Sequence, residues 1–444
     1  MIVLQFLYDS ATWLAQPLVR RKLRRRGRAE PGYLQAVPER FGQYHDAPAR
    51  PAPSRGAPLV WIHAVSLGET RAAAVLLPQL RAQWPDMRLL LTNGTATGRA
   101  EGQHLLKPGD VQVWQPWDTR AATTRFVRHY RPDLGVLMET EVWPNLVRAC
   151  RAAGVPLVLA NARLSERSMR GTLRAGRLLR AAYASLSAVY AQTGDDAVRL
   201  RQVGAAVEAV HGNLKFDAQP PPAMVALGER WREAAGGRAV VLLASSRPGE
   251  ELEFFRSIKA SEPDPSARAA IGNVVNRVQW LVVPRHPQRF DDVAALALNE
   301  GLTVSRRSTW QDAPLAADVW LGDSLGEMAA YYTLADVALL GGSFAPLGGQ
   351  NLIEAAACGC PVVMGPHTFN FTQAAELALR ADAALRAPDL PEGLRLACAM
   401  AADRTRHSVL AKAGRVFARR HQGAAARTAQ SLLQWVNPAP SGRS

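Results

Sequence analysis

The stretch DAQPPPAM, residues Asp217–Met224, divides this 444-residue chain into two halves of the same kind. Its three consecutive prolines require an extended backbone that neither a helix interior nor a central strand tolerates, so residues 217–224 are expected to form a linker. On both sides of it, short runs rich in Val and Leu alternate with longer helical stretches, the pattern of repeated βαβ units. A chain of this length fits two domains of about 200 residues each. We predict an α/β protein with two Rossmann-like domains that face each other across a cleft.

The expected strands are short apolar runs that end in polar residues. They begin at Leu59, Arg88, Val111, Leu134, Pro156 and Ala188 in the first half, and at Val240, Gln279, Val319, Val337 and Pro361 in the second. In open parallel sheets ligands bind at the carboxyl ends of the strands, so the residues directly after each strand are the functional candidates. The expected domains are residues 29–216 and 225–403, and residues 404–444 form a helix that packs back on the first domain.

Residues 1–28 combine an interrupted apolar helix with a basic block. Polar residues recur at helical spacing, at Gln5, Asp9, Thr12 and Gln16, opposite an apolar face. This pattern indicates an amphipathic helix at a membrane rather than a span of about 20 apolar residues. The alternative is a soluble helix packed on its own domain.

The basic block explains part of the formal net charge of +15. It consists of Arg20, Arg21, Lys22, Arg24, Arg25, Arg26 and Arg28. An anionic partner is therefore expected, and the block's position after an apolar helix favours a membrane surface over nucleic acid, for which no binding module is found. The block would also keep the following chain on the cytoplasmic side.

Three motifs of the first half carry polar residues at strand ends. HAVSLGET, residues 63–70, places Glu69 in the first turn of a helix, where the helix dipole stabilises an ionised carboxylate and a general base could stand. An ordinary helix start explains these residues equally. METEVWPN, residues 138–145, places Glu139 and Glu141 on one side of an extended chain, either to contact sugar hydroxyls or to bond backbone donors of the turn. Arg163 follows the next strand and suits a carboxylate or phosphate.

Two motifs of the second half follow buried strands. VPRHPQRF, residues 283–290, holds Arg285 and His286 between two prolines and presents both side chains at the sheet edge. LGDSLGEM, residues 321–328, has Ser324 and Glu327 at the spacing of a capping box, which predicts a capped helix there.

The longest motif is GGSFAPLGGQNLIEAAACGCPVVMGP, residues 341–366. Its paired glycines permit close backbone approach, and a helix beginning near Gln350 would offer free amides to a phosphate. Glu354 lies one turn inside that helix, placed for a ribose or a base. No DxD pair, Walker loop, GxSxG elbow or zinc-ligand spacing is present, so no metal and no cofactor are expected, and the protein itself would stabilise a departing nucleotide.

Taken together, these blocks resemble the Kdo (3-deoxy-D-manno-octulosonic acid) transferases of lipopolysaccharide biosynthesis. The resemblance covers nearly the whole chain and includes PGY at residues 31–33, ERFG at 39–42, GNLKFD at 212–217 and GPHTFNF at 365–371. It implies a GT-B type, inverting glycosyltransferase at the cytoplasmic face of the inner membrane. The donor would be CMP-Kdo, and the acceptor would be lipid IVA, the phosphorylated glucosamine disaccharide lipid that precedes lipid A.

The resemblance also implies roles for single residues. Glu69 would be the general base, with Glu139, Glu141 and Arg163 on the acceptor side in the first domain, and Arg163 also a candidate for donor charge. The donor set, largely in the nucleotide-sugar-binding second domain, would be Lys215, Arg285, His286, Gly326, Glu327, Ser343, Asn351 and Glu354. Arg247 and Gln350 stand where the family usually has histidine.

Two other functions agree with part of these observations. One is a GT-B transferase or epimerase that uses a UDP-sugar, which binding of UMP in preference to CMP would reveal. The other is a non-catalytic peripheral protein that holds acidic lipids through the basic block, for which Glu69 would be dispensable.

Overall fold

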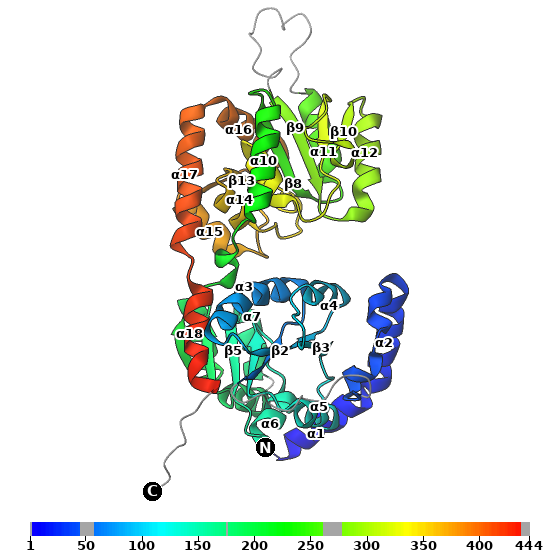
Figure 1. Ribbon diagram of the computed structural model, residues 1–444, viewed down its shortest axis with the longest axis vertical. Coiled ribbons are helices and arrows are strands. Elements are labelled where there is room, and N and C mark those ends of the chain that lie inside the picture. The colour runs from blue at the N-terminus through cyan, green and yellow to red at the C-terminus, as the bar shows by residue number, and fades with distance from the viewer. Residues whose placement is uncertain (1, 45–56, 175, 261–277, 437–444) are drawn as a thin grey trace, which may run out of the picture. The chain divides into compact units, whose positions relative to one another are not determined.

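The computed structural model describes most of the chain, namely residues 2–44, 57–174, 176–260 and 278–436. The chain forms two compact units: unit 1 comprises residues 1–217 and 422–444, and unit 2 comprises residues 218–421 (Figure 1). Each unit contains a seven-stranded sheet in which every pair of neighbouring strands is parallel. The predicted α/β class with two Rossmann-like sheets is confirmed.

The sheet of unit 1 has the strand order β3-β2-β1-β4-β5-β6-β7. Its strands are β1 (Leu59–His63), β2 (Arg88–Asn93), β3 (Val111–Trp114), β4 (Leu134–Met138), β5 (Leu157–Ala162), β6 (Ala188–Ala191) and β7 (Val207–Val210). The connecting helices are α3 (Leu67–Gln83), α4 (Ala96–Gln103), α5 (Arg120–Tyr130), α6 (Pro144–Ala152), α7 (Glu166–Arg174), α8 (Arg177–Ala184) and α9 (Gly194–Gln202). The strand order reverses between β1 and β4, and such a switch point opens a crevice at the carboxyl ends of these strands.

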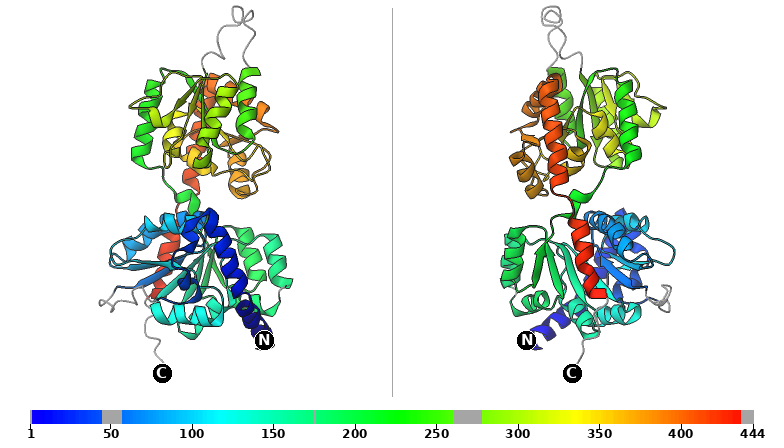
Figure 2. Two further views of the ribbon diagram at one scale, coloured as in Figure 1. Left: turned by 90° about the vertical axis from the view of Figure 1, so that its right-hand side faces the viewer. Right: turned by 60° about the vertical axis from the view of Figure 1, so that its left-hand side comes forward.

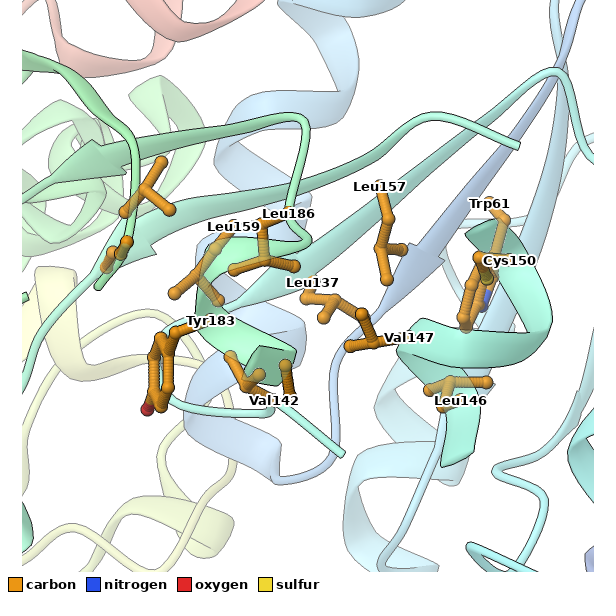
Figure 3. Close-up of a cluster of buried hydrophobic side chains, with 14 of the residues drawn as sticks. Trp61, Leu137, Val142, Leu146, Val147, Cys150, Leu157, Leu159, Tyr183 and Leu186 are labelled. Carbon is orange, nitrogen blue, oxygen red and sulfur yellow. The ribbon is translucent and has the colours of Figure 1, made fainter. Parts of the chain in front are cut away.

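Both faces of the unit 1 sheet are covered by helices. Helices α5, α6, α8 and α9 pack on one face, where Figure 3 shows the buried apolar cluster around Trp61 and Leu137. Helix α3 and the C-terminal helix α18 (Ala424–Val436) pack on the other. The Trp61 ring lies beside Gly135 of β4, where an added Cβ would come within 2.8 Å of it, so only glycine fits this register.

The sheet of unit 2 has the order β10-β11-β9-β8-β12-β13-β14 and reverses between β8 and β12. Its strands are β8 (Ala239–Ser246), β9 (Val278–Pro284), β10 (Val304–Arg306), β11 (Val319–Leu321), β12 (Val337–Leu340), β13 (Val362–Met364) and β14 (Ala384–Arg386). Its helices are α10 (Pro222–Ala234), α11 (Glu250–Ala260), α12 (Phe290–Asn299), α13 (Met328–Leu334), α14 (Leu352–Cys358), α15 (Thr372–Arg380), α16 (Leu390–Ala402) and α17 (Arg404–Arg420). The loops after β8 and β12 therefore form the switch point of this unit.

The linker and the C-terminal segment differ from the sequence prediction. Residues 222–224 are helical rather than extended, because Pro222 is the first residue of α10, where its missing N–H has no partner to lose. The C-terminal segment is two helices rather than one. Helix α17 packs on α14 in unit 2, and only α18 packs on α3 in unit 1 (Figure 2). Residues 437–444 lie outside the described part of the chain.

The N-terminal segment is also two helices, α1 (Ile2–Leu14) and α2 (Gln16–Ala29). The polar face of α1 contacts its own unit: Gln5 Nε2 donates to Asn145 Oδ1 at 3.0 Å, and Tyr8 Oη donates to Asp118 Oδ2 at 2.8 Å. The apolar face points to solvent. Its exposed large side chains are Val3, Leu4, Phe6, Leu7, Trp13 and Leu14. None of the helices in the described part of the chain combines the length and hydrophobicity needed to cross a bilayer.

Candidate active site

Glu69 lies at the carboxyl end of β1, in the first turn of α3. Ser66 caps this helix, because its Oγ accepts the Glu69 N–H at 3.3 Å and donates to Glu69 Oε1 at 3.1 Å. The other carboxylate oxygen, Oε2, accepts the Val65 N–H at 2.7 Å. A carboxylate has about four acceptor positions, so these bonds leave Glu69 able to accept a further proton or hydroxyl.

The pKa of Glu69 is raised to about 7, first by burial and next by the negative charge of Glu141. The charge of Glu139 adds to this increase, whereas the hydrogen bonds from Val65 and Ser66 oppose it. We expected the helix dipole to favour the ionised form, but burial beside other carboxylates outweighs that effect. The group is therefore half-protonated near neutral pH, where a general base is most effective.

Glu139 holds two cations: Arg163, which the sequence grouped with it, and Lys215, which the sequence assigned to the donor set. Its Oε2 lies 2.9 Å from Arg163 Nε and its Oε1 lies 3.4 Å from Lys215 Nζ. The Glu139 side chain is buried, whereas about half of the Arg163 side chain is exposed. Glu139 thus binds two groups of its own unit, and this geometry fits a positioning role better than direct contact with sugar hydroxyls.

Glu141 has a different environment from Glu139, contrary to the expectation from an extended chain. Strand β4 ends at Met138, and Glu139 adopts the left-handed conformation with φ 57°, so the chain turns instead of alternating. Glu141 Oε2 accepts from Trp143 Nε1 at 2.8 Å. Burial, and then the charge of Glu139, raises the pKa of Glu141.

The sequence interpretation missed Asn161, which positions Lys215. Asn161 ends β5 in the left-handed conformation with φ 52°, and its Oδ1 accepts the Leu214 N–H at 3.1 Å. That bond holds the 3-10 turn Leu214–Asp217 at the strand end. A signal was available in the sequence, because asparagine is the residue that most readily adopts φ > 0 after glycine.

In unit 2, cationic side chains collect at the carboxyl ends of β8 and β9. Arg247 Nη1 donates to His286 Nε2 at 2.7 Å, which requires a neutral imidazole ring. The pKa of His286 is lowered, first by partial burial and then by the charges of Arg247, Arg285 and Arg289. Arg285 and His286 are both exposed. This edge of the sheet can attract an anion.

Two buried carboxylates that the sequence did not single out support these cations. Glu250 accepts the Gly342 N–H with both oxygens at 2.8 Å, so it holds the glycine-rich loop after β12 against the start of α11. Glu251 pairs with Arg289 at 3.2 Å and accepts from Ser246 at 3.0 Å. The sequence did contain a signal for these two residues, because adjacent glutamates follow directly after a strand at the switch point.

The three residues predicted in and after the glycine-rich loop, Ser343, Asn351 and Glu354, have different environments. Ser343 is completely buried, donates to the Leu340 carbonyl and accepts the Gly365 N–H at 2.8 Å, so its hydroxyl joins the loops after β12 and β13. Asn351 caps α14 by accepting the Ile353 N–H at 3.1 Å. Glu354 lies in the first turn of that helix and is half-buried.

The predicted capping box at Ser324 and Glu327 is wrong. Helix α13 begins after Glu327, not after Ser324, and Glu327 makes no side-chain capping bond. Instead, Glu327 forms a bidentate pair with Arg307 at 2.9 and 3.0 Å and accepts from the Ser324 hydroxyl. Gly326 has φ 82°, which explains the glycine, and an added Cβ there would meet open space.

Within the described ranges, no group of three or more His, Cys, Asp or Glu side chains could hold a metal ion. The expectation that no metal takes part in the reaction stays a prediction.

The comparisons with known proteins agree with the motifs. A family model described as 3-deoxy-D-manno-octulosonic-acid transferase (kdotransferase) matches residues 35–218. The 3-deoxy-D-manno-octulosonic acid transferase of Bordetella pertussis is 46% identical over 427 residues, which cover 95% of this chain and 96% of the relative. The enzyme of the same name from Haemophilus influenzae is 32% identical over 378 residues, 83% of this chain and 84% of the relative.

A solved structure shows the same fold. The crystal structure of Anabaena HepE in complex with UDP-glucose matches 85% of this chain and 99% of its own length, with a TM-score of 0.54 and 16% identity. The high identities over nearly full length confirm the resemblance predicted from the sequence motifs. The chain belongs to the 3-deoxy-D-manno-octulosonic acid transferase family and is a glycosyltransferase.

Proposed function

We propose that this enzyme transfers Kdo from CMP-Kdo to lipid IVA, with inversion at the anomeric carbon and with Glu69 as general base. The observation that carries this proposal is the carboxylate of Glu69, buried at the switch point of unit 1 with its pKa raised to about 7. An acceptor hydroxyl has a pKa far above 7, so it needs a base of this kind within hydrogen-bond reach.

The proposed reaction is a single displacement. The acceptor oxygen attacks the anomeric carbon while its proton passes to the Glu69 carboxylate. The new carbon–oxygen bond forms as the bond to the CMP phosphate breaks on the opposite face, which inverts the centre. The phosphate charge that develops is stabilised by the cations at the ends of β8 and β9, foremost Arg285 and Arg247.

Substitution of Glu69 by Gln tests the role of the base. The amide keeps size and hydrogen bonding but cannot take the proton, so kcat should fall by about 10² to 10⁴ fold. Calorimetric titration with CMP should give an unchanged affinity, because the nucleotide contacts are assigned to unit 2. Near-normal turnover would exclude Glu69 as the base and direct attention to Glu141, and loss of CMP binding would indicate a structural role.

The donor is tested with the wild-type enzyme. CMP should bind more tightly than UMP in matched titrations, and mass spectrometry should detect Kdo on the lipid after incubation with CMP-Kdo and lipid IVA. Transfer should continue in EDTA, since the cations of unit 2 are proposed to take the place of a metal. Activity lost in EDTA and regained with magnesium would contradict this part of the proposal.

We also propose that α1 and α2 hold the enzyme on the cytoplasmic face of the inner membrane. The support is that α1 turns its polar face to unit 1 and its apolar face outward, the reverse of a helix packed in a soluble protein. The basic residues of α2 follow immediately and suit anionic lipid headgroups.

Vesicle sedimentation tests this attachment. Leu7→Glu with Leu18→Glu places two charges on exposed apolar positions and should release the protein from phosphatidylglycerol vesicles. The matched control, Leu315→Glu with Val409→Glu, changes equally exposed positions of unit 2 and should sediment like the wild type. Equal sedimentation of all three proteins would show that the apolar faces of α1 and α2 are not the anchor.

A further inference from the structure

A groove between α1 and α5 lies within unit 1 and contains none of the residues assigned to the reaction. Its volume is about 750 Å³, which is in the range of small-molecule sites. One wall is apolar and is formed by Phe6, Trp13 and Leu14 of α1. The other wall is basic and carries Arg120, Arg125 and Arg128 of α5. The groove is therefore amphipathic across its width.

The apolar wall is largely open to solvent. Phe6 is 69% exposed, Trp13 is 64% exposed and Leu14 is 66% exposed. Their spacing of seven and eight residues places them on one side of the helix. They remain uncovered because the polar side of α1 makes the contacts with unit 1, including the bond from Trp117 Nε1 to the Thr12 carbonyl at 3.1 Å. Exposed aromatic and aliphatic side chains grouped in this way indicate a ligand or membrane contact.

The basic wall has positive charge that the groove does not compensate. Arg125 donates to the carbonyls of Phe41 and Gly42 at 2.6 and 3.1 Å and is positioned by them. Arg120 and Arg128 are exposed and stand eight residues apart, on the same side of α5. The carboxylate that lines the groove, Asp9, already pairs with Arg148 at 3.3 Å. The open side of the groove thus presents guanidinium groups, which favour phosphate.

We propose that this groove binds one anionic phospholipid, with the headgroup phosphate at Arg120 and Arg128 and an acyl chain along Phe6, Trp13 and Leu14. The inference rests on the proposed membrane attachment and adds a defined lipid site to it. A zwitterionic lipid fits less well, because its ammonium group would enter a wall of uncompensated positive charge. The apolar wall belongs to the same face of α1 that is assigned to the membrane. A lipid of that membrane would therefore lie next to the groove.

Native mass spectrometry of the full-length protein, purified in detergent, tests the site. After incubation with equal amounts of phosphatidylglycerol and phosphatidylcholine, the wild type should retain one phosphatidylglycerol molecule. Arg120→Gln with Arg128→Gln should lower the retained fraction by about tenfold or more, since each arginine near a lipid surface contributes about fivefold. The control Arg174→Gln with Arg180→Gln removes the same charge from α7 and α8 and should retain the lipid.

The apolar wall is tested by fluorescence. Phosphatidylglycerol with brominated acyl chains, added at one molecule per chain, should quench tryptophan emission, and Trp13→Phe should remove most of that quenching although ten of the 11 tryptophans remain. Quenching unchanged in Trp13→Phe would overturn the placement of the acyl chain.

Equal retention of phosphatidylcholine would overturn the lipid site. Unchanged retention in Arg120→Gln with Arg128→Gln would also overturn it, and a raised KM for lipid IVA in that variant would then assign the groove to the acceptor. Vesicle sedimentation separates this result from failure of the attachment. A wild type that sediments but retains no lipid contradicts the site alone, whereas one that does not sediment contradicts the attachment.

Discussion

The switch points of the two sheets lie in equivalent places, beside the first strand of each unit, but they carry opposite charge. In unit 1, Glu69, Glu139 and Glu141 lie at the ends of β1 and β4, and burial next to one another raises the pKa of Glu69. In unit 2, Arg247 and Arg285 follow β8 and β9. A switch point beside the first strand thus supplies a proton acceptor in one unit and an anion site in the other, because different side chains follow the strands.

Carboxylates occur at both switch points, but their partners give them different roles. Glu250 and Glu251 of unit 2 are buried against backbone N–H groups, Ser246 and Arg289, and they hold the loops that carry the cations. In unit 1, Glu139 has that supporting role, because it forms ion pairs with Arg163 and Lys215. A carboxylate at a strand end is therefore functional or structural according to what it contacts, and sequence position alone does not distinguish the two.

The largest effect is expected from removing the cations of unit 2. Arg247→Ala with Arg285→Ala should weaken CMP binding by about 10² to 10⁴ fold, because each charge-assisted hydrogen bond contributes about 1.5–3 kcal/mol. The control Arg256→Ala removes an exposed arginine that pairs with Glu300 in the same unit and should leave the affinity unchanged. Calorimetry measures the CMP affinity of both variants. An unchanged affinity in the double variant would contradict the role of Arg247 and Arg285 as the anion site of unit 2.

The next effect concerns stability. The folded-state pKa of Glu69, about 7, exceeds the ordinary value of 4.5, so between these values the native protein holds a proton that the unfolded chain has released. The free energy of unfolding should fall as pH rises through this window, by at most about 3 kcal/mol. Glu69→Gln has no proton to lose and should therefore be the more stable protein at pH 8 but not at pH 4, as urea titrations of both proteins would show.

A smaller effect should follow when Glu139 no longer holds its two cations. Glu139→Gln removes the charge that positions Arg163 and Lys215, and we expect kcat/KM for CMP-Kdo to fall about tenfold. Glu166→Gln, which breaks the exposed pair with Arg170, serves as the control and should have wild-type kinetics. Wild-type kinetics in Glu139→Gln would refute the supporting role of Glu139.

The smallest effect is a change in pH dependence. Because the base must be ionised, kcat/KM should rise with pH through about 7, the pKa of Glu69. Glu141→Gln removes a negative charge that raises this pKa, so the acid limb of the profile should move to lower pH. Glu101→Gln, at an exposed pair with Arg71, should leave the limb in place. A limb that does not move would mean that the charge of Glu141 does not contribute to the pKa of Glu69.

Most of the fold could be predicted from local pattern. Eleven strand positions were predicted from short Val- and Leu-rich runs, and among the strands that the structure describes the three missed ones are β7, β10 and β14. All three lie at sheet edges and have only three or four residues, with alternating or incomplete burial. Edge strands bury too little surface to need the apolar runs that mark central strands.

Helix boundaries and side-chain partners could not be predicted in the same way. The spacing of Ser324 and Glu327 matches a capping box, but the bidentate pair with Arg307, twenty residues away, holds Glu327 elsewhere. The left-handed Glu139 likewise ended the expected alternation with Glu141, and its backbone pairs with a distant segment: its N–H donates to the Ala160 carbonyl at 3.0 Å and its carbonyl accepts the Arg163 N–H at 3.2 Å. Contacts between distant segments decide both cases.

The sequence by itself determined the family, the two parallel sheets and the identity of the chemical groups after each strand, because these follow from apolar periodicity and from motifs that are local in the chain. Only the tertiary structure decided which of those groups are desolvated, which are paired and which face outward. In the folded protein, Glu69 is buried beside two other carboxylates, and Arg163 and Lys215 form ion pairs with Glu139. The apolar side of α1 is exposed to solvent. The physical reason is that pKa values, ion pairs and exposure depend on neighbours that are close in space but far apart along the chain.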